Sequence, residues 1–189
     1  MHQNDLLTLF RRSGALLEGH FRLSSGLHSP GYLQCALVLA HPRDAETIGT
    51  ALGEVLRRYG ATVVLSPALG GVVIGHEVGR ALGVRAIFAE RQDNGLTLRR
   101  GFSLTPSDKV IVVEDVLTTG LSTRETMEVA KAAGAKVVAA CAMIDRSAGN
   151  HNLDVPFHAL LPMRLPTYQP ESCPLCEQGL PVTKPGSRK

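Results

Sequence analysis

Features that would place a chain in a specialised class are scarce in this sequence. Its 189 residues include no tryptophan, 4% aromatic residues and four cysteines. With few aromatic rings and no run of basic residues, the chain has neither a stacking platform nor a charged stripe for long nucleic acid, so no nucleic-acid partner is expected. It also has no apolar run of membrane-spanning length and no signal peptide at its N-terminus. We therefore expect a cytoplasmic protein without a membrane partner.

Two common phosphate-binding motifs are missing as well. The chain contains neither the P-loop pattern G-x-x-x-x-G-K-[ST] nor the dinucleotide pattern G-x-G-x-x-G. What remains is an ordinary globular composition, 44% hydrophobic and 20% charged, with a net charge of +3. Because this length and composition suit one sizeable hydrophobic core, we predict a single domain over residues 1–189.

Apolar segments alternate with helical patterns through most of the chain. Strands are predicted at residues 62–66, 84–90, 110–115 and 136–145. Helices are predicted at residues 4–13, 43–59, 72–82 and 122–133. A short antiparallel β-unit is predicted at 20–35, and the Pro- and Gly-rich chain after about residue 162 is expected to run over the surface. Strands that alternate with helices predict an α/β fold whose mostly parallel sheet is covered by helices on both faces.

One segment, VIVVEDVLTTGLST at residues 110–123, carries most of the chemical signal. Glu114 and Asp115 directly follow an apolar strand, where carboxylates are costly to bury. The turn after them is rich in hydroxyl groups, and Ser122 with Glu125 matches the S-x-x-E capping box of a helix start. Such a turn offers backbone N–H groups to a phosphate, while carboxylates accept hydrogen bonds from hydroxyls. The combination predicts a ribose phosphate site, which we favour over the simpler interpretation of solvated acids before a capped helix.

These residues resemble the phosphoribosyl pyrophosphate (PRPP) binding signature of type I phosphoribosyltransferases. Four further segments are similar to those of orotate phosphoribosyltransferases in particular. They are FRLSSGLHSPGYLQC (21–35), like the N-terminal hood; SPALGG (66–71), like the pyrophosphate loop; IDR (144–146), like the base-contacting strand end; and CPLCEQGLPVTKPGSR (173–188), like the tail of a Thermus-type bacterial branch. The resemblance covers nearly the whole chain.

The resemblance implies a fold and a reaction. The fold would be that of type I phosphoribosyltransferases, a single domain in which residues 1–40 form a small hood and residues 163–189 a surface tail. The enzyme would join orotate to the ribose of PRPP, release pyrophosphate and give orotidine 5'-monophosphate in pyrimidine synthesis. Mg²⁺ would be the cofactor, held mainly by oxygens of the substrate rather than by protein ligands. Family members often form a homodimer in which each lid serves the neighbouring site, and we expect the same here.

The resemblance also implies roles for individual residues. Glu114 and Asp115 would hold the ribose hydroxyls as catalytic groups, and Asp115 would also relay a proton. PRPP would contact the signature, the pyrophosphate loop and one lid residue, namely Glu114, Asp115, Val116, Leu117, Thr118, Thr119, Gly120, Leu121, Ser122, Ala68, Leu69, Gly70, Gly71 and Arg91. Orotate would contact Thr118, Arg146, Tyr32 and Leu33. The guanidinium of Arg146 suits the carboxylate of orotate.

A polar segment at residues 91–101 lacks a core face and is predicted to be the mobile lid over the site. Three of its arginines would supply charge for the pyrophosphate, namely Arg91 and the two catalytic candidates Arg99 and Arg100. The best-known orotate enzymes carry lysines and a histidine in this lid, and this sequence has neither. Ser24 and Gly70 likewise stand where those enzymes have lysines. Arginine can replace the charge of lysine, but it cannot act as a general acid near neutral pH.

Two other functions would use the same phosphoribose signature. A purine-base phosphoribosyltransferase would share it, although Arg146 and the hood segment argue against a purine. A non-catalytic regulator that senses PRPP would share it too. The missing lid lysines leave that alternative open, although the chain shows no DNA-binding domain and no strongly basic face.

The four cysteines fall into two classes. Cys35 and Cys141 lie alone in apolar runs and are predicted to be buried, reduced thiols. Cys173 and Cys176 have the spacing of half a zinc site, but no second pair of cysteines follows. We therefore favour a surface thiol pair over a metal site.

Two ways of completing a zinc site remain open. Two copies of the chain could bring their cysteine pairs together across a dimer axis. Alternatively, His151 and His158 could supply the missing ligands. His20 and His28 flank the predicted hairpin of the hood, and we interpret them as exposed.

Overall fold

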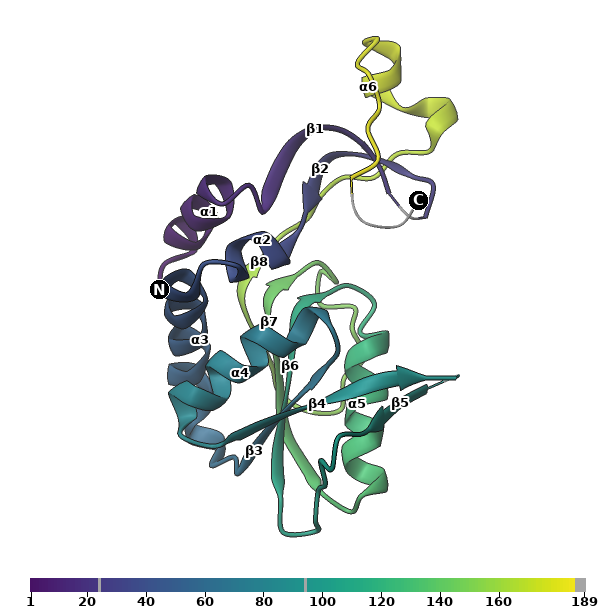
Figure 1. Cartoon of the computed structure of the whole chain (residues 1–189). Coiled ribbons are helices and arrows are strands. Elements are labelled where there is room, and N and C mark those ends of the chain that lie inside the picture. The colour runs from purple at the N-terminus through teal and green to yellow at the C-terminus, as the bar shows by residue number, and fades with distance from the viewer. Residues whose placement is uncertain (24, 94, 186–189) are drawn as a thin grey trace.

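The computed structural model describes residues 1–23, 25–93 and 95–185, so Ser24 lies outside the described residues. Its centre is a six-stranded sheet with the strand order β5-β4-β3-β6-β7-β8 (Figure 1). The strands are β3 (Val63–Pro67), β4 (Arg85–Gln92), β5 (Gly95–Leu98), β6 (Lys109–Leu117), β7 (Lys136–Asp145) and β8 (Phe157–Pro162). Neighbouring strands are parallel except β4 and β5, which form an antiparallel hairpin. The predicted α/β class with a mostly parallel sheet is confirmed.

Helices cover both faces of this sheet (Figure 1). Helices α3 (Pro42–Leu56), α4 (Gly70–Leu82) and α5 (Leu121–Ala132) pack on it. Along β6, Ile111 and Val113 belong to the core that includes α3 and α4, whereas Val110 and Val112 belong to the core that includes α5. All four side chains are fully buried. A strand between two helical layers needs apolar side chains on both faces, which explains the continuous apolar run in the sequence.

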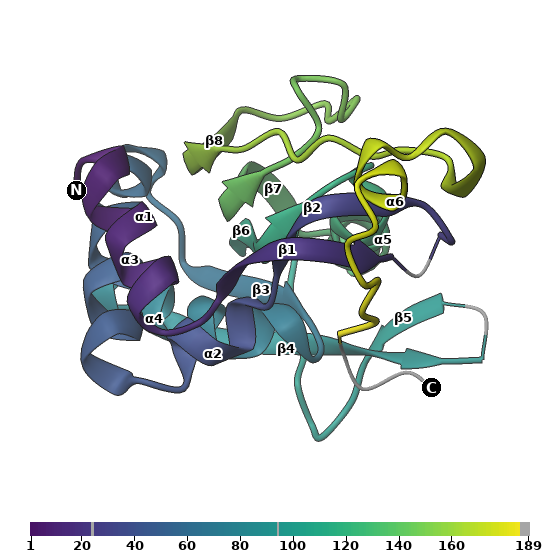
Figure 2. The same cartoon turned by 90° about the horizontal axis from the view of Figure 1, so that it is seen from above.

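A smaller hood lies beyond one end of the sheet (Figure 1). It consists of α1 (Gln3–Arg12), β1 (Leu16–Arg22), β2 (His28–Leu33) and α2 (Cys35–Leu39). β1 and β2 pair antiparallel, and seen from above they lie over the end of β6 and β7 (Figure 2). The hood therefore covers the carboxyl ends of the parallel strands, where open α/β sheets bind their ligands.

The C-terminal segment packs against the hood (Figure 1). After β8 it forms a 3₁₀ turn (Pro170–Ser172) and the short helix α6 (Pro174–Glu177). Tyr168 and His28 exchange two backbone hydrogen bonds of 2.9 Å. Further along, the N–H of Thr183 donates to the carbonyl oxygen of His20 at 2.9 Å. The predicted surface tail is thus joined to β1 and β2 by backbone hydrogen bonds, and its residues 186–189 lie outside the described residues.

The lid segment differs from its prediction. Residues 95–98 form β5, and Leu96 and Leu98 pack against the core that includes α5. The prediction of a segment without a core face is therefore wrong for these four residues. Two leucines that alternate with Gly95 and Thr97 are the period-two signal of a half-buried strand, and the surrounding charged residues obscured it. Asn94, which belongs to the predicted lid segment, lies outside the described residues.

The elements α2, α6 and β8 and the 3₁₀ turn at Pro170–Ser172 were also absent from the predicted set. β8 adds a sixth strand beside β7, although its sequence FHALLP is short and ends in proline. Among the described residues, no helix combines the length and the apolar composition needed to cross a membrane.

Candidate active site

The predicted phosphate turn joins β6 to α5. β6 continues past its predicted end and includes Glu114 to Leu117, and α5 begins at Leu121. Between them, Gly120 adopts a left-handed φ of 73°, and a Cβ at this position would lie 2.9 Å from the carbonyl oxygen of His151. Glycine therefore lets the chain turn sharply from strand to helix. The first backbone N–H groups of α5 have no partners within the helix, so they can meet an anion here.

Glu114 is nearly buried at the end of β6, with 7% of its surface exposed. Its Oε2 accepts a 2.6 Å hydrogen bond from the hydroxyl of Ser122, and its Oε1 accepts one of 3.2 Å from the backbone N–H of Asp115. Burial, followed by the charge of Asp115, raises the pKa of Glu114 to about 8. Glu114 is therefore partly protonated near neutral pH.

Ser122 does not cap α5 as predicted. The N-cap is Gly120, and no side chain in the described part of the protein caps the helix. The hydroxyl of Ser122 donates to Glu114 instead, and Glu125 forms an ion pair with Arg91 of β4. The predicted capping box is wrong because Ser122 lies inside the first turn, where a buried carboxylate takes its hydroxyl group.

The predicted pyrophosphate loop follows β3 and meets the phosphate turn. Ala68 and Leu69, joined by a cis peptide bond, lead into α4, and Leu69 is 87% exposed. A Cβ at Gly70 would lie 2.9 Å from both carboxylate oxygens of Asp115. Only a residue without a side chain lets the loop approach this carboxylate so closely. The structure thus brings Asp115 next to the start of α4, whose free N–H groups favour an anion.

A cleft of about 650 Å³ lies between the hood, the phosphate turn and the tail. All four residues predicted to contact orotate line it, namely Tyr32, Leu33, Thr118 and Arg146. Arg146 directly follows β7, and its backbone N–H donates to the carbonyl oxygen of Leu117 at 2.8 Å. Burial lowers the pKa of Arg146, but a guanidinium remains protonated in proteins. The cleft therefore contains a half-buried positive charge that suits an anionic ligand.

Three residues at this site were not predicted. Arg22 of β1 and Lys184 of the tail add positive charge to the lining of the cleft. Packing of the tail on the hood brings Lys184 there, and no motif or spacing in the sequence signals that contact. Cys35, at the start of α2, is buried as predicted. Burial, then the charges of Asp115 and Glu114, raise the pKa of its thiol.

The lid arginines are paired with acids of the same chain. Arg100 donates two hydrogen bonds of 2.8 Å to Glu90, and Arg91 forms its ion pair with Glu125. Arg99 is exposed and forms no ion pair within the described residues. None of the three arginines lines the cleft that contains the orotate residues. Their predicted action on pyrophosphate stays a prediction, and it requires Arg91 and Arg100 to exchange partners.

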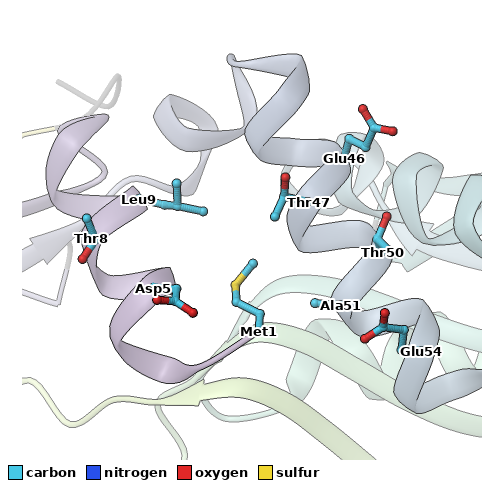
Figure 3. Close-up of a pocket in the computed structure, with 9 residues that line it drawn as sticks. All are labelled: Met1, Asp5, Thr8, Leu9, Glu46, Thr47, Thr50, Ala51 and Glu54. Atoms are coloured by element: carbon cyan, nitrogen blue, oxygen red, sulfur yellow. The ribbon is translucent and has the colours of Figure 1, made fainter.

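Figure 3 shows a different hollow, of about 710 Å³, between α1 and α3. Its lining includes the three acids Asp5, Glu46 and Glu54 and no lysine or arginine. It shares no residue with the cleft under the hood. A hollow with acidic side chains and no basic ones does not suit a phosphate ligand, so we place the candidate active site under the hood.

Similarity to known proteins shows the family of the chain. Residues 37–158 match the phosphoribosyl transferase domain family. The protein is 53% identical to the orotate phosphoribosyltransferase of Carboxydothermus hydrogenoformans, over 98% of each chain. The chain belongs to the orotate phosphoribosyltransferase family. A second member, from Heliobacterium modesticaldum, is 52% identical over 100% of each chain. The predicted family resemblance is confirmed, while the Thermus-type branch stays a prediction.

Solved structures of the orotate phosphoribosyltransferase family share the fold. The structure of orotate phosphoribosyltransferase from Aeropyrum pernix matches with a TM-score of 0.73 and 24% identity, over 84% of this chain and 93% of the other. The Mycobacterium tuberculosis enzyme in complex with inorganic phosphate matches with a TM-score of 0.71 and 24% identity, over 85% and 95% of the two chains. The predicted type I phosphoribosyltransferase fold is confirmed.

Proposed function

We propose that the protein transfers the phosphoribosyl group of PRPP to orotate, giving orotidine 5'-monophosphate and pyrophosphate in pyrimidine synthesis. One observation carries the proposal: the ribose phosphate turn after β6 and a cationic cleft lined by Arg146 meet at one end of the sheet. Full-length relatives that are named orotate phosphoribosyltransferase support the choice of base. They also favour this activity over a purine transferase or a PRPP-sensing regulator.

The phosphate turn holds the ribose phosphate of PRPP. Residues 118–122 offer backbone N–H groups and hydroxyls to the 5'-phosphate, at the positive end of the α5 dipole. Glu114 and Asp115 accept hydrogen bonds from the ribose hydroxyls. Because Ser122 already donates to Glu114, the hydroxyl that recognises phosphate and the carboxylate that recognises ribose are held as one unit.

Orotate occupies the cleft under the hood. Its carboxylate and ring oxygen meet the guanidinium of Arg146, which can donate two parallel hydrogen bonds. Thr118 lies beside Arg146 in the lining of the cleft, so the base and the ribose phosphate share one wall. The ring of Tyr32 packs against that of Phe21, with centroids 6.0 Å apart, which holds it in position over the base.

Bond breaking leaves charge on the pyrophosphate and on the ribose. The transfer passes through an oxocarbenium-like state and requires no protein nucleophile. The start of α4 faces the leaving group with its free N–H groups, beside Asp115. Closure of the β4–β5 hairpin excludes water and brings the lid arginines to the pyrophosphate.

Mg²⁺ fits this arrangement. The carboxylate oxygens of Asp115 lie against the pyrophosphate loop at Gly70, and such hard oxygen donors are what Mg²⁺ prefers. In the part of the chain that the structure describes, no salt bridge neutralises Glu114 or Asp115. Mg²⁺, held mainly by the substrate's own oxygens, supplies positive charge to the pyrophosphate when it is bound.

We also propose a homodimer in the cytoplasm. The dimer follows the resemblance to family members whose lids serve the neighbouring site. The buried, unpaired thiols of Cys35 and Cys141 suit a reducing compartment.

A spectrophotometric assay tests the activity. The protein, PRPP and Mg²⁺ are mixed with orotate, hypoxanthine or uracil in parallel, and consumption of each base is followed, for orotate by the loss of its absorbance. We expect turnover of orotate alone. Replacing Asp115→Asn should lower turnover about a hundredfold or more, because the ribose loses a charged partner and the proton relay. The matched control is Asp154→Asn, which removes an acid that pairs with Lys131 at the surface and should leave the kinetics unchanged.

Three results would count against the proposal. Turnover of hypoxanthine alone would select a purine transferase. Failure to turn over any of the three bases would favour a PRPP-binding regulator. Equal kinetics for Asp115→Asn and Asp154→Asn would show that Asp115 has no catalytic role.

A further inference from the structure

Four side chains of metal-binding type converge where the tail meets the hood. They are His20 of β1, His28 of β2, Cys173 at the start of α6, and Cys176 within α6. One possible ligand atom from each lies within 4.8 Å of all the others. None of the four lines the cleft that we assign to orotate, so this cluster is a separate feature of the molecule.

Three of the six distances between the possible ligand atoms match the edges of a tetrahedral metal site, and the others lie within 4.8 Å. Cys173 Sγ lies 3.6 Å and Cys176 Sγ 3.8 Å from His20 Nε2, and Cys176 Sγ lies 3.4 Å from His28 Nδ1. Zinc bonds of about 2.3 Å to sulfur and about 2.0 Å to nitrogen give tetrahedron edges of about 3.3–3.8 Å. The His20 Nε2 to His28 Nδ1 edge is 2.9 Å, so it would lengthen by a few tenths of an ångström on binding.

The second shell of this cluster is already in place. His20 Nδ1–H donates to the carbonyl oxygen of Leu180 at 2.8 Å. This hydrogen bond selects the tautomer whose Nε2 lone pair faces the other three ligands. A metal-bound histidine almost always donates its second ring nitrogen to a carbonyl or carboxylate in this way.

Three of the four possible ligands are buried, as is typical of a structural metal site, and the fourth is exposed to solvent. His20, His28 and Cys173 are only 4%, 6% and 1% exposed, while Cys176 is exposed. Without a metal, the two imidazoles and the buried thiol have, among the described residues, only one another, Cys176 and the carbonyl oxygen of Leu180 as polar partners. The exposed Cys176 leaves a path for an ion to enter.

We propose that His20, His28, Cys173 and Cys176 bind one structural Zn²⁺. Two thiolates and two imidazoles in a tetrahedron are the ligand set that zinc prefers, and four protein ligands leave no open position for catalysis. Binding displaces the two thiol protons to solvent, so affinity should rise with pH. The predicted surface thiol pair is therefore wrong for Cys173, and the prediction that His20 and His28 are exposed is wrong as well.

The other histidines considered from the sequence lie elsewhere. His158 makes a 2.7 Å hydrogen bond with the hydroxyl of Tyr59. The ring of His151 packs against Phe157 with centroids 4.9 Å apart. The ligands come from one chain, so no second copy is needed to complete the site.

A bound zinc ion would link the hood to the C-terminal tail, and residues of both line the cleft that we assign to orotate. The cluster lies between the backbone bridge of His28 with Tyr168 and that of Phe21 with Thr183. The next residue, Lys184, lines the cleft, as does Arg22 on the hood side. An ion that holds the tail on the hood therefore holds both of these cationic side chains at the orotate cleft without touching the substrate.

Metal analysis of the full chain tests the proposal. The protein is produced without an affinity tag, purified under reducing conditions, and analysed by plasma mass spectrometry. We expect one zinc per chain. Cys176→Ser and His28→Asn should each lose zinc, whereas the control variants Cys141→Ala and His158→Asn should keep it. The controls remove a thiol and an imidazole that lie outside the cluster.

Cobalt gives a second measurement that does not need a folded variant. Wild-type protein stripped of zinc and loaded with Co²⁺ should show the thiolate-to-cobalt charge-transfer band and the visible absorption of tetrahedral cobalt. Two results would overturn the proposal. One is wild-type protein that contains no zinc and takes up neither ion after reduction. The other is full zinc content in both Cys176→Ser and His28→Asn.

Discussion

Glu114 and Asp115 are adjacent carboxylates with different surroundings. Glu114 is buried and hydrogen-bonded to Ser122, whereas Asp115 is partly exposed and faces the pyrophosphate loop at Gly70. The sequence indicated one pair of acids, but alternate residues of a strand point to opposite sides. One acid is therefore kept partly protonated while its neighbour stays accessible to substrate.

The raised pKa of Glu114 predicts a pH effect on stability. In the unfolded chain its carboxyl ionises near the ordinary value of 4.5, and in the folded protein near 8. Between these values the folded state binds more protons, so the free energy of unfolding should fall as pH rises. Glu114→Gln cannot ionise and still accepts a hydrogen bond from Ser122. As pH rises from 4.5 to 8, the unfolding free energy of the wild type should therefore fall relative to that of Glu114→Gln, by on the order of a few kcal/mol.

Urea unfolding at several pH values measures this difference. Glu128→Gln serves as the control, because Glu128 is exposed and pairs only with Lys131. We expect the control to follow the wild type. A constant difference between wild type and Glu114→Gln from pH 4.5 to 8 would show that Glu114 is ionised throughout in the folded state.

At the scale of elements, the β4–β5 hairpin is attached to the core, and its role as a lid stays a prediction. Leu96 and Leu98 attach β5 to the core, while Arg91 and Arg100 are held by acids. Surface ion pairs of this kind contribute about 0–1 kcal/mol, so a pyrophosphate with its concentrated charge can displace them. Lid closure therefore requires changes in side-chain pairing more than unfolding of the hairpin.

Substitution of the lid arginines tests this role. Arg99→Gln and Arg100→Gln should each lower kcat at least about tenfold and change the KM for orotate little, because the charge acts on the leaving pyrophosphate. Steady-state kinetics with both substrates measure the two constants. Arg80→Gln is the control, since Arg80 lies on α4 and pairs with Glu46 and Glu77. Unchanged kcat in both lid variants would contradict the catalytic role.

At the scale of the whole molecule, the substrate cleft is assembled from parts far apart in the chain. Arg22 comes from the hood, Thr118 from the phosphate turn, Arg146 from the end of β7 and Lys184 from the tail. The proposed zinc holds the first and last of these parts together. The proposed dimer would add a lid from the neighbouring subunit.

Mixed dimers test whether lids act between subunits. Two tagged chains are co-expressed, one with Asp115→Asn and one with Arg100→Gln, and the heterodimer is isolated with both tags. If each lid serves the neighbouring site, one site has both an intact Asp115 and an intact Arg100, and roughly half of the wild-type activity returns. If each lid serves its own site, the heterodimer stays as inactive as its parents. A monomer by light scattering would exclude the arrangement altogether.

Most of the sheet and the phosphate turn were predictable because their signals are local. The apolar run of β6 followed by two acids, a hydroxyl-rich turn and Gly120 indicated a strand, a ligand and a helix start in one segment. The position of Arg146 at the carboxyl end of the sheet was predictable because this residue directly follows a strongly apolar strand. The capping box failed because it depends on which partner a hydroxyl chooses, and the buried Glu114 competes for Ser122.

The order of residues was enough to predict the α/β fold, because the periodicity of strands and helices acts over a few residues, and the segment at residues 110–123 was enough to show the resemblance to phosphoribosyltransferases. Folding alone brought His20 and His28 within reach of Cys173 and Cys176, and placed Lys184 beside the cleft. Each histidine is separated from each cysteine by more than a hundred positions in the sequence. Their proximity comes from the path of the tail across β1 and β2, and that path is set by backbone hydrogen bonds, which leave no pattern in the side-chain sequence.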